Sequence, residues 1–267
     1  MAGSGPNQRM SNTDRIWERW GQIDPYYGVL AHDRFNKANI HANRDEFFAT
    51  GEDFIARLLG RLERHFGPLK LDRALDHGCG VGRLTLPLAR RFGEVVGLDV
   101  SPAMLSEAKV NARRGGLKNV TFGLADDQLT NAPGDFDFVN SYIVLQHVPV
   151  KRGIGIMIAL LDKVRPGGGF QIHLSVRTDH WRSRALWWSS IHIPGVKIIQ
   201  NVMAGRAWNA PAMQMNDYPL QTVLTKLVER SITDLLVSAE RHDKFVTCSI
   251  IGKKALAPAL SGTATAA

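Results

Sequence analysis

The sequence lacks the features that mark membrane-spanning, secreted or disulfide-rich proteins. Its longest apolar run, GIGIMIALL at 153–161, is well short of the roughly 18 to 20 residues that cross a bilayer. The first residues contain no apolar core of a secretory signal peptide. With only Cys79 and Cys248 in the chain, no disulfide framework is implied. These absences predict a cytoplasmic protein, and the hydrophobic fraction of 44% suffices for a full core.

The net charge of +8 is unevenly distributed along the chain. Residues 163–267 contain 13 basic and 6 acidic side chains, an excess of +7. Such an excess can attract an anionic substrate, an acidic membrane surface or nucleic acid, and it can equally be a solvated surface. Because no RNA-binding module or basic-aromatic strand pattern accompanies it, nucleic acid is the least favoured partner.

The two ends of the chain and the segment after residue 10 differ in pattern. Residues 1–10 and 256–267 are small, polar or repetitive, and we expect them to be disordered. Ser11 to Asp14 has the capping-box pattern that begins a helix, and helical spacing of apolar residues continues from 44 to 67. We therefore expect an N-terminal helical cap over residues 11–69.

From residue 70 onward strands and helices alternate. Strands are predicted at 73–77, 94–100, 120–125, 136–143 and 169–176, and helices at 83–92, 102–115 and 150–164. Parallel strands need crossovers of this length, so the order predicts a Rossmann-like, doubly wound α/β sheet. Two further strand-like runs, 232–241 and 244–254, are separated only by a tight connection and predict an antiparallel pair.

The stretch ALDHGCGVGRLTLPLA, residues 74–89, predicts a strand, a glycine turn and a helix. Such a turn lets the backbone approach a nucleotide-bearing ligand, although it can also be a tight connection alone. A dinucleotide site usually has glycine at the position that Arg83 occupies here. The spacing of Gly78, Gly80 and Gly82 after Asp76 instead favours another adenosine-bearing ligand.

Polar side chains also end the next three predicted strands. Asp99 ends the second, where a carboxylate can accept both hydroxyls of a ribose. Asp126 and Asp127 end the third, where a carboxylate can accept an adenine amino group, and Asn140 and Ser141 end the fourth. Because parallel strands end at one sheet edge, these groups are expected to border one ligand site.

Five segments in this order resemble the class I S-adenosylmethionine-dependent methyltransferases of the bacterial small-molecule type. They are LDHGCGVGRLT (75–85), VVGLDVSPAMLSEAK (95–109), VTFGLADD (120–127), FDFVNSYIVLQHVP (136–149) and LLDKVRPGGGFQI (160–172). The resemblance implies a methyltransferase domain over residues 70–255, with a seven-stranded sheet in which one strand is antiparallel. It also implies S-adenosylmethionine as cofactor and S-adenosylhomocysteine as product.

The resemblance assigns cofactor contacts position by position. Asp76 and the turn containing Gly78, Cys79, Gly80 and Gly82 would flank the methionine portion. Asp99 would hold the ribose, and Val100 and Met104 would contact adenine. The remaining contacts would come from Ala125, Asp126, Asp127, Asn140 and Ser141. His77 departs from the small or apolar residue that is commoner at its position.

Three residues are candidates for catalysis or acceptor binding. His147 follows the fourth predicted strand and could act as a general base, or it could have a structural role. His173 lies within the fifth strand, where a core role competes with a catalytic one, and Tyr142 could position the substrate or pack in the core. We favour His147. No metal cluster stands out in the sequence, so no metal site is predicted.

Two segments outside the sheet could cover the cofactor. The segment DPYY at 24–27 resembles the Asp/Asn-Pro-Pro-Tyr tetrad of enzymes that methylate amino groups of nucleic acids, but it lacks the second proline. Tyr26 and Tyr27 could close over the cofactor or pack within the cap. Residues 177–230 form an insertion after the fifth strand, rich in Trp and Arg. Its part from 177 to 208 could be a lid, a membrane-surface contact or a helical cap.

Together the motifs predict methylation of a small-molecule acceptor, which could be anionic or glycosylated. O-methylation of a sugar, glycolipid or natural-product hydroxyl is the favoured reaction. N-methylation of a small amine or lipid headgroup, a non-catalytic cofactor-binding subunit and a nicotinamide oxidoreductase are the alternatives.

Overall fold

The computed structural model describes residues 10–178, 188–189, 193, 195–203, 209–242 and 245–256. Most of the two ends predicted to be disordered therefore lies outside the described residues, as does much of the predicted insertion. Within the described residues, no helix is both long and apolar enough to cross a membrane.

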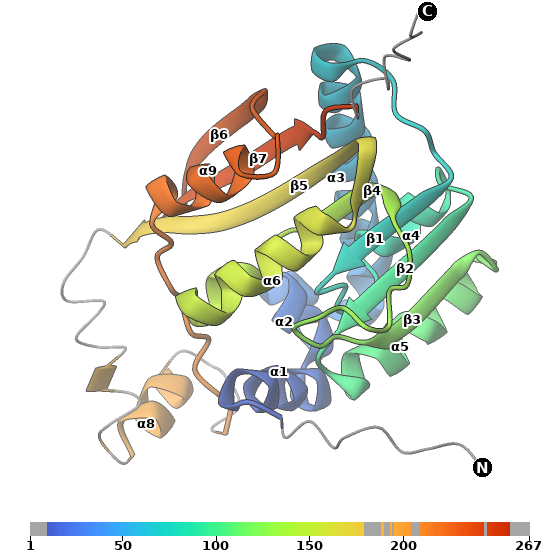
Figure 1. Ribbon diagram of the computed structural model, residues 1–267. Helices are drawn as coiled ribbons and strands as arrows, with labels where there is room; N and C mark the ends of the chain where they lie inside the picture. The colour runs from blue at the N-terminus through green and yellow to red at the C-terminus, as the bar shows by residue number, and fades with distance from the viewer. Residues whose placement is uncertain are drawn as a thin grey trace, which may run out of the picture.

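A seven-stranded sheet in the order β3-β2-β1-β4-β5-β7-β6 forms the centre of the fold (Figure 1). The strands are β1 (Arg73–His77), β2 (Glu94–Asp99), β3 (Val120–Leu124), β4 (Phe136–Ser141), β5 (Val164–Thr178), β6 (Leu235–His242) and β7 (Phe245–Lys253). Strands β1 to β5 pair in parallel, while β7 is antiparallel to both β5 and β6. The predicted doubly wound sheet with one antiparallel strand is confirmed.

Helices cover both faces of this sheet (Figure 1). In chain order they are α1 (Asn12–Ile23), α2 (Pro25–Val29), η1 (Asp33–Phe35), α3 (Ile40–Phe66), α4 (Thr85–Ala89), α5 (Pro102–Arg114), η2 (Leu145–His147), α6 (Val150–Asp162), α8 (Val196–Met203) and α9 (Leu220–Val228). Helices α6 and α9 contribute to the core on one face. Helices α3 and α4 contribute to the core on the other face.

The beginning of α1 has the predicted capping box. The Ser11 hydroxyl accepts a hydrogen bond from the Asp14 amide at 3.2 Å, and the Asp14 carboxylate accepts one from the Ser11 amide at 2.9 Å. These two bonds satisfy amides that the first helical turn leaves without partners. Trp20 is buried in a small core with α2 and Met104 of α5. The capping box therefore fixes where α1 begins, and the apolar face of α1 anchors this helix beside α5.

Several element boundaries differ from the sequence-based expectation. The helix predicted at 83–92 is shorter because residues 80–84 remain in turn conformation before α4. The strand predicted at 169–176 is longer because β5 pairs with β4 from Val164 and with β7 as far as Thr178. Helix α3 begins four residues earlier than predicted, within a segment that shows no clear hydrophobic period.

Candidate functional site

The glycine turn after β1 adopts backbone angles that favour glycine. Gly78, Gly80 and Gly82 have φ values of +72°, +52° and +91°. The amides of Gly78 and Cys79 donate to the carbonyl oxygen of Leu98 at 2.7 and 2.9 Å, which ties the turn to β2. A Cβ atom at Gly78 would lie 2.2 Å from a methyl group of Val144. The turn is therefore held against two neighbouring segments with no space for a side chain there.

Asp76 lies at the end of β1, buried within the sheet edge. Its carboxylate accepts hydrogen bonds from the Thr85 hydroxyl at 2.6 Å and the Asn140 amide at 2.7 Å. Burial raises the pKa of Asp76 to about 6, although both hydrogen bonds oppose the shift. Asn140, a predicted cofactor contact, thus orients Asp76 and does not itself line the cavity described below.

Asp99 at the end of β2 is the second buried carboxylate. One of its oxygens accepts from the Gly80 amide at 2.9 Å and the other from the Ser101 amide at 2.9 Å. Burial raises the pKa of Asp99 to about 6 as well, while these two backbone bonds act in the opposite direction. The carboxylate therefore connects the end of β2 to the middle of the glycine turn.

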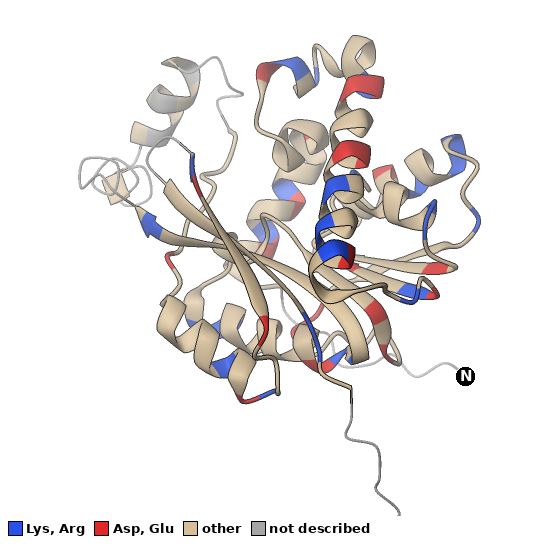
Figure 2. Cartoon of the chain, turned by 90° about the horizontal axis from the view of Figure 1, so that it is seen from above, with Lys and Arg blue, Asp and Glu red and all other residues tan. Residues whose placement is uncertain are grey.

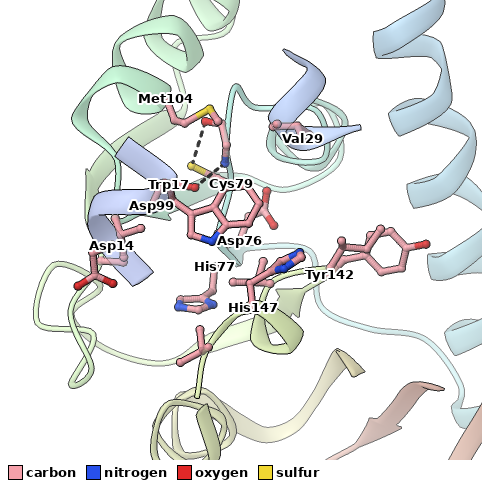
Figure 3. Close-up of a pocket in the computed structure, with 18 of the residues that line it drawn as sticks. Asp14, Trp17, Val29, Asp76, His77, Cys79, Asp99, Met104, Tyr142 and His147 are labelled. Carbon is pink, nitrogen blue, oxygen red and sulfur yellow. Dashed lines mark hydrogen bonds between the residues drawn. The ribbon is translucent and has the colours of Figure 1, made fainter. Parts of the chain in front are cut away.

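A cavity with about 940 Å³ of empty volume, part of it open to solvent, lies between these strand ends and the N-terminal helices (Figure 3). Its cap wall consists of Thr13, Asp14, Trp17, Gly28 and Val29 from α1 and α2. Its strand-end wall consists of Asp76, His77, Gly78, Cys79, Gly80, Arg83, Leu84, Asp99, Val100, Ala125, Tyr142, Ile143, Val144, His147 and Val148. Met104 of α5 and Arg152 and Ile156 of α6 complete the lining.

Contacts at both ends of α1 hold the cap wall in place. The Glu18 carboxylate accepts hydrogen bonds from the Ser101 hydroxyl at 2.7 Å and the Ala103 amide at 3.2 Å, at the beginning of α5. Near the other end, the Arg152 guanidinium forms ion pairs with Asp14 and Asp127, with the closest atoms 2.8 Å apart in each pair. Asp127, a predicted cofactor contact, is thus the partner of an arginine from α6.

The histidine predicted as a general base, His147, lines the cavity and is buried. Its Nδ1 lies 2.6 Å from the carbonyl oxygen of Gln214. Because a carbonyl can only accept, Nδ1 bears the proton and Nε2 keeps its lone pair. Burial lowers the pKa of His147 to about 4, although the Gln214 bond opposes the shift. The ring lies 4.8 Å from that of Trp17 in the cap wall, centroid to centroid (Figure 3).

Residues 214–218 hold the loop that contains His147. The Asn216 amide donates to the carbonyl oxygen of Gln146 at 2.7 Å. The Tyr218 hydroxyl lies 2.8 Å from the carbonyl oxygen of Leu145 and 3.0 Å from that of Val148. These contacts span about 70 positions of sequence, so His147 depends on a distant segment for its orientation.

A second histidine of the strand-end wall, His77, has no predicted role beyond its departure from the family pattern. Its Nδ1 lies 3.2 Å from the Ser141 hydroxyl. Burial lowers the pKa of His77 to about 4, and the nearby charge of Arg152 acts in the same direction. The cavity therefore contains two neutral imidazoles at neutral pH.

Eight of the predicted site residues do not line the cavity: Gly82, Asp126, Asp127, Asn140, Ser141, Tyr26, Tyr27 and His173. Asp126 accepts from the Thr130 hydroxyl and from the amides of Gln128 and Thr130, while the adjacent Ala125 does line the cavity. Burial acts to raise the pKa of Asp126, but these hydrogen bonds outweigh it and the pKa is lowered. His173 packs against Tyr142, with ring centroids 4.8 Å apart.

The two tyrosines of α2 pack within the cap. The Tyr26 hydroxyl donates to the Glu107 carboxylate at 2.6 Å, and its ring packs edge-on against Phe47. The Tyr27 ring stacks on Trp20 at 5.8 Å between centroids. The next two residues along the chain, Gly28 and Val29, are the ones that border the cavity.

Sequence reasoning missed much of the lining, including Thr13, Asp14, Trp17, Gly28, Val29, Arg83 and Arg152 as site residues. Trp17 lies three residues before the buried Trp20 on α1, but such helical spacing does not show that this face borders a cavity. The structure also places Ile143 in the lining, with a φ of +58° that strains a β-branched residue directly after Tyr142. Among the described residues, no group of three or more His, Cys, Asp or Glu side chains is arranged to hold a metal ion.

Comparison with known proteins relates this geometry to a family. A family model described as a methyltransferase domain matches residues 74–168. A ubiquinone biosynthesis O-methyltransferase from Mesorhizobium japonicum is 31% identical over 153 residues, 57% of this chain and 55% of that protein. A 23S rRNA (uracil(1939)-C(5))-methyltransferase from Xylella fastidiosa is 47% identical over 75 residues, 28% of this chain and only 16% of that protein. The chain thus spans only part of these relatives.

A solved structure extends the likeness to the whole fold. The magnesium protoporphyrin IX methyltransferase from Synechocystis, solved with bound SAM, has a TM-score of 0.59 at 15% identity. The alignment covers 93% of this chain and all of that one (100%). The sheet order found here, with one antiparallel strand, is that of the class I methyltransferase fold. Residues 74–168 of this chain are therefore part of a methyltransferase domain with the class I fold.

Proposed function

We propose that the chain transfers the methyl group of S-adenosylmethionine to a hydroxyl group of a small molecule, a sugar, a glycolipid or a natural product. The observation that carries this proposal is the cavity in which buried Asp76 and Asp99 end two neighbouring strands beside a glycine turn. The matches to methyltransferase domains and the SAM-bound structural neighbour support the choice of cofactor.

The residues around Asp99 fit the adenosine part of such a cofactor. Each carboxylate oxygen of Asp99 accepts one backbone amide, which leaves lone pairs for two ribose hydroxyls. Val100, Met104 and Ala125 line the same part of the cavity and would contact adenine. Asp126 would reach the adenine amino group from the turn after β3.

The methionine part would lie along the glycine turn. Gly78 and Gly80 approach the cavity without side chains, and Asp76 offers a carboxylate to an ammonium group. Ser141, beside His77 at the end of β4, would contact the amino-acid end through its backbone. The cofactor supplies an activated methyl group, so the chain must mainly align the acceptor with it. Such alignment alone gives effective molarities of about 10⁵ to 10⁸ M.

A hydroxyl acceptor also needs a group that takes its proton, and the neutral imidazole of His147 is the candidate. Its Nδ1 proton is held by the Gln214 carbonyl, so Nε2 is the basic nitrogen. Its low pKa keeps the imidazole neutral at neutral pH, so the Nε2 lone pair is free, and the same shift makes it a weaker base than an exposed imidazole. General-base assistance of this kind contributes roughly 10² to 10⁴-fold. Tyr142 in the same wall would position the acceptor, and His173 would support Tyr142 through ring packing.

Two observations support a small acceptor. Along the long helix α3, Arg side chains are interspersed with Asp and Glu (Figure 2), a mixed pattern unlike the single-sign stripe typical of nucleic-acid binding. The ubiquinone biosynthesis relative is named as an O-methyltransferase, and its match extends over more of this chain than that of the rRNA enzyme.

The domain organisation follows from the same proposal. Residues 11–69 would be the cap over the cofactor, residues 70–255 the methyltransferase domain, and residues 177–230 an insertion beside the acceptor. Helix α8 of this insertion exposes Ile198, Ile199 and Met203, which supports peripheral contact with a membrane surface. Co-sedimentation with anionic liposomes at low salt tests this contact, and a protein that stays in the supernatant would contradict it.

A turnover assay tests the reaction itself. The purified protein is incubated with S-adenosylmethionine and a panel of sugars, phenols, glycolipids and amines, and S-adenosylhomocysteine is measured. We expect formation that depends on a hydroxyl acceptor and is lost in a parallel His147→Ala reaction. Turnover with amines alone would contradict O-methylation, and cofactor binding without turnover of any acceptor would favour a non-catalytic subunit.

A further inference from the structure

Arg83 is a buried cation in the cavity that the proposed chemistry does not use. It follows the glycine turn, lines the cavity and is only 6% exposed. Its terminal nitrogen Nη1 lies 3.4 Å from the Thr50 hydroxyl of α3, a long contact with a neutral group. Its Nε is buried without a hydrogen-bond partner. The guanidinium is thus withdrawn from water with most of its donors unused.

The surroundings of Arg83 are built closely around it. At Gly51 of α3, a Cβ atom would lie 2.1 Å from the Arg83 carbonyl oxygen and 3.1 Å from its Cγ. Glycine at this position lets α3 pack directly on the arginine. The backbone and the first part of the side chain are therefore fixed, which keeps the guanidinium at the cavity.

No carboxylate neutralises this charge among the described residues, since none lies within 4.0 Å of the guanidinium nitrogens. The two titratable groups that act on it electrostatically are Tyr142 and Asp76. Asp76, whose carboxylate is oriented by Thr85 and Asn140, forms no ion pair with Arg83. Buried charges in proteins are normally paired, because an unpaired one loses its hydration without compensation.

We propose that Arg83 binds a carboxylate of a ligand in this cavity. Its planar fork of donors matches a carboxylate, and such charge-assisted bonds are the stronger kind. The inference rests on the proposed function for the nature of the ligands. Two of them could supply the group: the methyl donor through its amino-acid carboxylate, or an acceptor that is a carboxylic acid. The chemistry is the same, and two arms of one experiment distinguish the sources.

The first arm compares S-adenosylhomocysteine with its analogue that lacks the carboxylate, using calorimetry on the full chain and on Arg83→Gln. If the cofactor supplies the carboxylate, the wild-type chain prefers S-adenosylhomocysteine by roughly 10- to 100-fold. The substitution then abolishes most of that preference by weakening S-adenosylhomocysteine binding alone. Affinity for the analogue stays within about threefold.

The second arm titrates benzoate into protein saturated with S-adenosylhomocysteine, with chloride at equal ionic strength as the blank. If the acceptor supplies the carboxylate, benzoate binds the wild-type complex but not the Arg83→Gln complex, and the first arm shows no change in preference. Either result supports the proposal, and the two results identify different sources of the carboxylate. Arg90→Gln is the matched control, because Arg90 pairs with Glu52 outside the cavity and is 47% exposed in its side chain.

A stability measurement separates ligand binding from a structural role. Removing an unpaired buried charge should leave the thermal midpoint of the ligand-free protein unchanged or raised, whereas removing a structural residue lowers it. Arg83→Lys keeps the positive charge but not the planar set of guanidinium donors, so it should retain part of the preference for S-adenosylhomocysteine over the analogue. This variant tests the proposal if Arg83→Gln does not fold.

The proposal is overturned if S-adenosylhomocysteine binds the wild-type chain while Arg83→Gln changes neither its preference over the analogue nor benzoate binding. A lowered thermal midpoint together with unchanged binding would likewise overturn it. Failure of the wild-type chain to bind S-adenosylhomocysteine at all would instead contradict the proposed function.

Discussion

The two walls of the cavity are built in different ways. The strand-end wall is fixed mainly by sheet register and by backbone amides of adjacent strand ends, such as those of Gly80 and Ser101 that donate to Asp99, and residues 214–218 hold its His147 loop. The cap wall is placed by side chains far apart in sequence, such as Asp14 and Arg152. One wall is part of the sheet and the other is attached to it. This difference predicts that the strand-end wall determines chemistry and ligand identity, whereas the cap wall determines how fast ligands enter and leave.

The largest effect should come from the strand-end residue assigned to proton transfer. His147→Ala should lower turnover by roughly 10² to 10⁴-fold, because it removes the general base. Affinity for S-adenosylhomocysteine, measured by calorimetry, should change by less than about threefold. His65→Ala, at an exposed position on α3, is the control. Unchanged turnover in His147→Ala would remove this residue from the mechanism.

The second effect concerns cofactor affinity. Asp99→Asn should weaken S-adenosylhomocysteine binding by roughly 10- to 100-fold, since it removes a charged acceptor and places an amide opposite the Gly80 amide. Asp72→Asn, at an exposed position just before β1, is the matched control. Equal affinities in the two variants would argue that the ligand does not use this strand end.

The pH dependence of binding comes from the same wall. Burial raises the pKa of both Asp76 and Asp99 to about 6, so each group is about half protonated near pH 6 in the empty site. A ligand that needs the ionised forms competes with that protonation. Affinity for S-adenosylhomocysteine should be nearly flat between pH 7 and 8 and fall at pH 5 by up to about tenfold for each carboxylate that must be ionised, which is about 100-fold if both must be. Tighter binding at pH 5 would contradict the assigned roles.

The smallest effect should come from the cap wall. Arg152→Met removes the ion pairs that join α1 to α6 and to the turn after β3. These pairs are partly exposed, so their loss should speed S-adenosylhomocysteine dissociation about 3- to 10-fold. Turnover chemistry should be nearly unchanged. Arg230→Met, which removes an ion pair with Asp162 away from the cavity, is the stopped-flow control. A larger loss of S-adenosylhomocysteine affinity in Arg152→Met than in Asp99→Asn would reverse the roles assigned to the two walls.

The same difference explains what the sequence could predict. The strand ends and the glycine turn were predictable because a parallel sheet brings consecutive strand ends to one edge. The cap wall was not, because its contact between Asp14 and Arg152 joins positions 138 residues apart. For Tyr26 and Tyr27 the sequence left both closure over the cofactor and packing within the cap open; their rings pack in the cap, and Gly28 borders the cavity. Helical periodicity shows which residues are apolar, but not which surface they meet.

The orientation of His147 shows a second limit. Its position after β4 followed from the motif, but its tautomer depends on the main-chain oxygen of Gln214. A backbone atom has no signature in the residue type, so no pattern could have assigned it. The charge of Arg83 was visible in the sequence, whereas its burial without a carboxylate partner depends on how α3 packs.

Calorimetry with S-adenosylhomocysteine and with NAD on the full chain tests the central claim most directly. We expect a saturable isotherm near one S-adenosylhomocysteine per chain, weakened in Asp99→Asn, and no saturable heat with NAD. Saturable binding of NAD with none of S-adenosylhomocysteine would contradict it.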